Sequence, residues 1–119
     1  MENKNKPIGL DPAVIPLVNY FNSIGLNTHM SCEGHDQDNK SMFWIEFDKT
    51  VTEEDIEAFL IRLKEKYGSS ATCGCFAMRI FPGPKYTMRR WRYMAATKEA
   101  ARQDYIFFTT GKDYGVIYE

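Results

Sequence analysis

Residues 50–68 have the strongest helical periodicity in the chain, and this feature limits the fold more than any other. Their apolar side chains recur at steps of three and four residues and so line one side of a helix: Ile56, Phe59, Leu60, Leu63 and Tyr67. Either Thr50 with Glu53, as a capping box, or Thr52 with Asp55 can begin this helix, and Gly68 can end it. A helix with one apolar side needs a second layer to pack against.

Two segments of alternating apolar residues predict strands that supply this second layer. In residues 42–47, every other side chain is large and apolar, with Phe43, Ile45 and Phe47 on one face and Met42, Trp44 and Glu46 on the other. Residues 72–81 alternate in the same way, and Pro82-Gly83-Pro84 ends the strand. Residues 26–31 predict a further short strand before a polar loop at residues 36–41.

Two more segments predict helices. Residues 11–24 have helical spacing with Asp11 as a cap, but Pro16 moves the regular start to about Ile15, and Gly25 ends the helix. Residues 88–108 contain neither Gly nor Pro and have apolar residues at helical spacing, which predicts a third helix after Thr87. The end of that segment, residues 105–110, equally suits a strand of a terminal hairpin with residues 116–118.

These elements predict an α+β fold, in which two or three helices cover a small, mostly antiparallel sheet of three to five strands. The length of 119 residues predicts a single domain over residues 1–119, with residues 1–9 as a loose tail. The chain has no apolar run of the roughly 18 residues that cross a bilayer, and its polar start is not followed by an apolar stretch of the signal-peptide type. We therefore expect a cytoplasmic protein, whose three cysteines are reduced thiols.

The formal charge of −1 conceals two unlike halves. Residues 1–60 carry 4 Lys and Arg against 11 Asp and Glu, which gives −7, and residues 61–119 carry 11 against 5, which gives +6. Such asymmetry is typical of chains with an anion-binding surface on one part.

Cysteine and histidine residues cluster in the segment Thr28-His29-Met30-Ser31-Cys32-Glu33-Gly34-His35. This segment, after a helix and before an aromatic strand, resembles the T-x-x-S-C-[EQ]-G-H signature of small phage and prophage proteins. In size and layout the chain also resembles phage Thoeris anti-defence proteins, which sequester cyclic ADP-ribose signals. The resemblance implies an accessory protein of the host cytoplasm that binds a signal, and no functional residue is carried over from either group.

The residues themselves leave three interpretations of Cys32 and His35. With Cys73 and Cys75 they have the composition of a zinc site, although a one-residue gap between two cysteines is less typical than a two-residue gap. Alternatively, Cys32 is a nucleophile with a histidine as base, in a thiol- or metal-dependent hydrolase. In the third interpretation, which we favour, Cys32 is a small packed side chain and His35 a polar contact.

A second cluster is basic and aromatic: Arg79, Phe81, Lys85, Tyr86, Arg89, Arg90, Trp91, Arg92, Tyr93, Lys98 and Arg102. Residues 85–104 hold six Lys and Arg against two acidic residues, a net +4. Arginine side chains bind phosphate in a bidentate manner, and aromatic rings stack on bases. The alternative is a solvated helix face that pairs with the acidic half. Duplex DNA suits the chain less well than a small ligand, because the acidic half repels a long polyanion.

We therefore predict a binding protein, with no catalytic residue and no cofactor, that sequesters a small phosphorylated nucleotide-like ligand. The predicted ligand contacts are His35, Trp44, Arg79, Phe81, Arg89, Arg90, Trp91 and Arg92. The alternative is a zinc protein or hydrolase centred on Cys32 and His35, with Cys73 and Cys75 as further metal ligands. A homo-oligomer is expected, because so short a chain forms a deep pocket most readily between subunits.

Overall fold

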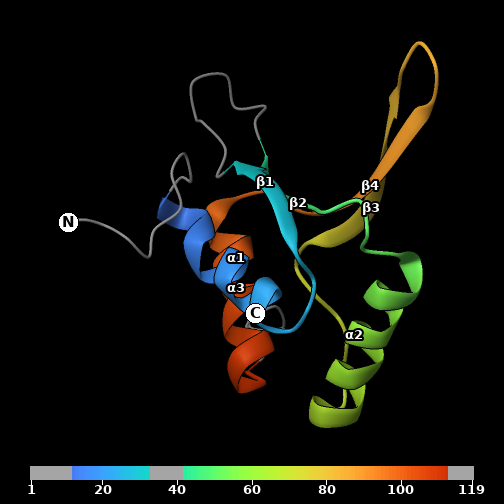
Figure 1. The fold of residues 1–119 in the computed structure, drawn as a ribbon. Coiled ribbons are helices and arrows are strands. Elements are labelled where there is room, and N and C mark those ends of the chain that lie inside the picture. Colours follow the sequence, from blue (N-terminus) through green and yellow to red (C-terminus); the bar gives the residue numbers. More distant parts are fainter. Residues whose placement is uncertain (1–11, 33–41, 113–119) are drawn as a thin grey trace.

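A four-stranded antiparallel sheet forms one layer of the protein in the computed structural model, which describes residues 12–32 and 42–112. Its strands are β1 (Thr28–Cys32), β2 (Phe43–Phe47), β3 (Cys75–Pro82) and β4 (Thr87–Ala95), in the spatial order β1-β2-β4-β3. The sheet and three α-helices confirm the predicted α+β class, and Figure 1 shows their arrangement.

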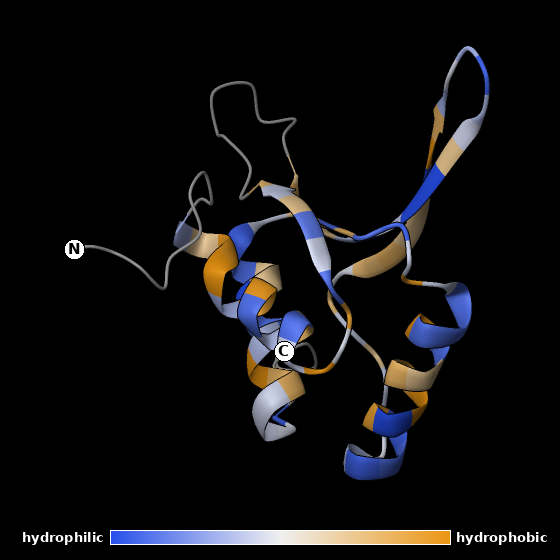
Figure 2. Ribbon diagram, in the orientation of Figure 1, coloured by the Kyte–Doolittle hydropathy of each residue, from blue (hydrophilic) through white to orange (hydrophobic). Residues whose placement is uncertain are grey.

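The helices are α1 (Ile15–Ser23), which follows a short 3-10 turn at Pro12–Val14, α2 (Glu53–Tyr67) and α3 (Lys98–Thr110). All three contribute rings to a core on one face of the sheet, which we call the inner face. Phe21 of α1 contacts the rings of Phe47, Phe76 and Tyr93 from three strands and Phe108 from α3. The hydropathy pattern in Figure 2 shows apolar and polar stretches alternating along α2. The opposite, outer face of the sheet has no helix over it among the described residues.

The local signals around α1 behave as predicted. The regular helix starts at Ile15, with Pro16 inside its first turn, where the missing N–H breaks no helical hydrogen bond. Gly25 adopts the left-handed conformation, at φ 92°, and the chain reverses there: the Leu26 N–H donates to the Phe21 carbonyl. The predicted cap at Asp11 lies outside the described residues.

Of the two candidate caps for α2, the structure uses the second. The Thr52 side chain accepts from the Asp55 N–H, and the Asp55 carboxylate accepts from the Thr52 N–H, which makes this pair the capping box. The other alternative, a box of Thr50 with Glu53, does not form, because Thr50 instead donates to the Asp48 carboxylate in the preceding turn. Gly68 ends the helix at φ 84°, as predicted.

The prediction of one long helix over residues 88–108 is wrong in its first half. Residues 87–95 form β4, whose backbone pairs with β2 on one side and β3 on the other. Two neighbouring strands and the burial of Tyr93 and Ala95 outweigh the weak helical preference of this segment. The helix starts only after Thr97, whose hydroxyl accepts from the Ala100 N–H. Residues 105–110 are helical, and the proposed partner strand at residues 116–118 lies outside the described residues.

The hairpin of β3 and β4 extends past the end of β2, whose last pairing is Glu46 with Arg92. We call its projecting end, residues 78–91, the arm; Figure 1 shows it rising from the sheet. Buried Asp104 of α3 anchors the entry to this hairpin, because its carboxylate accepts from the Cys73 and Gly74 N–H groups and from the Tyr93 hydroxyl. The position of the arm is thus tied to α3.

Candidate anion-binding site on the outer face

The outer face of the sheet gathers charged and aromatic side chains from β2, β3 and β4. Met30, Glu46 and Arg92 pair across β1, β2 and β4, and Arg79 pairs with Arg90 across β3 and β4. Because directly opposed residues of antiparallel strands share a face, and every second residue of a strand returns to it, Glu46, Arg79, Arg90 and Arg92 share the outer face.

Glu46 is the centre of an ionic cluster on this face. Its Oε1 accepts from Arg92 Nε at 3.1 Å, and its Oε2 lies 3.6 Å from Arg90 Nε and 3.9 Å from His29 Nε2. The Glu46 side chain is only 3% exposed, and those of Arg90 and Arg92 are 12% and 11% exposed. Two guanidinium groups thus share one carboxylate in a largely water-excluded place, which leaves one positive charge in excess.

Arg90 is the residue of this cluster whose hydrogen-bond donors are not all satisfied. Its Nη2 points to the Met88 sulfur at 3.2 Å, which is a weak acceptor. Its Nη1 is buried and has no hydrogen-bond partner among the described residues. A buried charged donor without an acceptor is costly, so an anion that bonded to Nη1 would gain a charge-assisted hydrogen bond to a guanidinium that is already desolvated.

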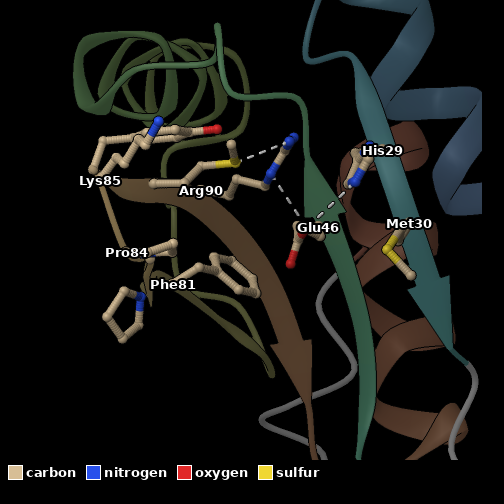
Figure 3. A pocket seen from close by; sticks show the side chains of 11 residues that line it. His29, Met30, Glu46, Phe81, Pro84, Lys85 and Arg90 are labelled. Carbon is tan, nitrogen blue, oxygen red and sulfur yellow. Dashed lines mark hydrogen bonds and ion pairs between the residues drawn. The ribbon is translucent and has the colours of Figure 1, made fainter.

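Arg90 and Glu46 line a pocket of about 500 Å³ between the arm and the first two strands. In Figure 3, His29 and Met30 border it from β1 and Glu46 from β2, while Phe81, Pro84 and Lys85 border it from the end of the hairpin. The remaining lining residues are Pro82, Gly83, Tyr86 and Met88. The pocket therefore combines cationic groups with the flat rings of Phe81 and Tyr86.

Two cation–ring pairs stand on the same face. The Arg92 guanidinium lies 4.0 Å from the centre of the Trp44 ring, and the Arg79 guanidinium lies 4.7 Å from that of Phe81. Such contacts keep the two guanidinium groups beside aromatic rings, where they can also contact an added ring or phosphate.

The structure divides the predicted ligand contacts into two groups. It brings five of them onto the outer face: Trp44, Arg79, Phe81, Arg90 and Arg92. Arg89 and Trp91 alternate with them along β4 and so lie on the inner face, where Trp91 packs at the margin of the core. His35 lies outside the described residues. In the expected helix Arg89 and Arg92 would share a side, but in a strand successive side chains alternate, so the two residues lie on opposite faces.

The cysteines do not come together within the described residues. Cys32, Trp44, Met94 and Cys75 form one row across the sheet, so Cys32 and Cys75 are three strand spacings, about 14 Å, apart. The Cys73 thiol donates to Gln103 of α3. No group of three or more metal-ligating side chains forms within residues 12–32 and 42–112.

Sequence reasoning did not find Glu46 and grouped His29 with Cys32 only. A signal for Glu46 was available, because it is the one carboxylate within the apolar segment Phe43–Phe47. A buried carboxylate in a strand calls for cationic partners, and β4 supplies two of them at the register of Glu46. The pairing of β2 with β4 was the information that the sequence pattern lacked.

Comparison of the chain with protein-family models, curated proteins and solved structures found no match. In the part of the chain that the structure describes, no helix has both the length and the apolar character for a membrane span.

Proposed function

We propose that the protein binds a small phosphorylated nucleotide-like ligand in the outer-face pocket and sequesters it without turnover. The observation that carries this proposal is the buried, unpartnered Nη1 of Arg90, in a cluster whose two arginines exceed its one carboxylate. A phosphate oxygen supplies both the missing acceptor and the missing negative charge.

The rings around the pocket support a ligand that has a planar group as well as an anion. Phe81 and Tyr86 border the same pocket as Arg90, and Lys85 adds a second cation at its rim. A nucleotide joins a flat base to a phosphate at a distance of a few ångströms, which suits a pocket of about 500 Å³. The resemblance to phage proteins supports a role in removing a signalling nucleotide of a host defence system.

The proposal is tested by calorimetric titration, in buffer of low ionic strength, with inorganic phosphate and with linear and cyclic nucleotides. Arg90→Gln removes the buried cation, and Arg89→Gln is the matched control, because it makes the same change on the neighbouring residue of the opposite face. A charged hydrogen bond contributes about 1.5–3 kcal/mol, so we expect Arg90→Gln to weaken nucleotide binding roughly 10- to 100-fold. Arg89→Gln should leave the affinity unchanged.

Two results would contradict the proposal. The first is a protein that binds neither phosphate nor any nucleotide at low salt. The second is equal weakening in both variants, because this would indicate a general effect of positive charge rather than a site at Arg90. A third measurement tests the absence of turnover: chromatography of the nucleotide after the titration should show it unchanged, and a reaction product would indicate catalysis instead of sequestration.

A further inference from the structure

The inner face of the arm exposes apolar side chains that no helix covers among the described residues. Met78 is 40% exposed and Ile80 is 54% exposed, although both point to the side on which the helices pack farther down the hairpin. Exposed Arg89 pairs with Ile80 across the two strands. The arm holds four Lys and Arg and no Asp or Glu, and of these Arg89 lies on the same inner face as Met78 and Ile80.

A second exposed surface on the same chain has the complementary character. On α2, the side turned away from the core carries Glu54, Glu57, Ile61 and Glu65, which follow at three- and four-residue steps, with Ala58 beside them. Ile61 is 57% exposed, and its neighbours one turn away are the acids Glu57 and Glu65, together with Lys64. We call Glu54, Glu57, Ile61 and Glu65 the acidic stripe. An isoleucine flanked by carboxylates fits an isoleucine and a methionine flanked by arginine.

Within one copy these two surfaces face away from each other. The stripe lies opposite the side of α2 that packs on the core, and Figure 1 shows the arm and α2 extending from the sheet in divergent directions. Two such surfaces can meet only between copies.

We propose that the inner face of the arm docks against the acidic stripe of α2 on a second copy of this chain. In a two-fold dimer each copy gives its arm and receives the arm of its partner, so every contact occurs twice. The apolar residues Met78, Ile80 and Ile61 form the centre of each contact, and Arg89 with the carboxylates of the stripe forms the rim. The occupant is a second copy because the chain itself holds the charge complement of its arm.

Light scattering coupled to size exclusion tests this interface over a wide range of protein concentration. We expect the wild-type protein to be a dimer that dissociates on dilution and in high salt. Arg89→Glu and Glu57→Lys each place like charges in the contact, and each should weaken dimerisation by about tenfold or more. The double variant Arg89→Glu/Glu57→Lys exchanges the two charges and should recover much of the dimer.

The control variants Arg102→Glu and Glu99→Lys make the same charge changes on α3, and the dimer should tolerate them. Circular dichroism of every variant confirms that it is folded. A wild-type protein that is monomeric at all concentrations overturns the proposal, as does a dimer that Arg89→Glu leaves intact. A double variant that recovers nothing also overturns it, because the two sites then do not face each other.

Discussion

The first prediction concerns Asp104, because this one buried side chain accepts hydrogen bonds from three donors in two separate parts of the fold. Its carboxylate accepts from Cys73 N at 2.7 Å, from Gly74 N at 2.7 Å and from the Tyr93 hydroxyl at 2.5 Å. These bonds join α3 to β4 and to the segment that enters β3. The Asp104→Ala variant removes all three acceptor positions at once.

The size of the effect follows from the number of donors and their burial. A buried donor left without an acceptor costs about 1–3 kcal/mol, and the loop around Cys73 is open enough for water to serve some of this need. We therefore expect Asp104→Ala to lower the free energy of unfolding by about 4 kcal/mol, which is a large part of the roughly 5–15 kcal/mol of a typical domain. With an unfolding entropy of about 2.1 cal/mol/K per residue, this corresponds to a melting temperature lower by roughly 16 °C.

Urea titration and thermal melts followed by circular dichroism measure this loss. Tyr93→Phe is the graded comparison, because it removes one of the three donors and leaves the carboxylate in place, and it should cost about 1 kcal/mol. Arg102→Ala, an exposed change on the same helix, should have little effect. A loss below about 1.5 kcal/mol in Asp104→Ala would refute the argument, because it would mean that these donors find other partners at little cost.

Three further predictions have equally definite outcomes. Burial, together with the Asp104 carboxylate, raises the pKa of Tyr93 well above its ordinary value of 10, so the neutral phenol stabilises the fold at lower pH. Above pH 10 the unfolded chain loses the Tyr93 proton, whereas the folded chain keeps it. The difference in free energy of unfolding between the wild type and Tyr93→Phe should therefore fall by about 1.4 kcal/mol per pH unit, as measured by urea titrations. Glu46→Gln removes the counter-charge of two arginines, so it should lower the free energy of unfolding by about 3 kcal/mol. Added phosphate should raise the melting temperature of this variant more than that of the wild type, and equal shifts would argue against an anion at Arg90. Thr52→Ala removes the capping box of α2 and should cost about 1 kcal/mol in the same melts, whereas Thr50→Ala should cost less.

The sequence was informative where a structure depends on neighbouring residues alone. The spacing of apolar residues identified α2, and the two glycines expected to end α1 and α2 do follow them, both in the left-handed conformation. The alternation in β2 placed Phe43, Ile45 and Phe47 on one face, and each of them is buried. These features need only the periods of helix and strand and the steric freedom of glycine.

The candidate site was predicted in composition and only partly in arrangement. Arg79, Phe81, Arg90, Arg92 and Trp44 were selected by type, and they do share one face. Arg89 and Trp91 were grouped with them because the segment was expected to be a helix, in which near neighbours can share a side. In a strand they point to the other face, so a single error in secondary structure changed the membership of the site.

The sequence by itself determined the elements with local signals, the antiparallel character of the sheet and the concentration of positive charge in the second half of the chain. Only the tertiary structure decided that residues 87–95 are a strand, because that state depends on hydrogen bonds to β2 and β3, which are distant in sequence. The same pairing sets Arg92 directly opposite Glu46, and Arg90 reaches that carboxylate from two residues away. The excess charge and the unpartnered nitrogen of Arg90 arise from this register, which no local pattern encodes.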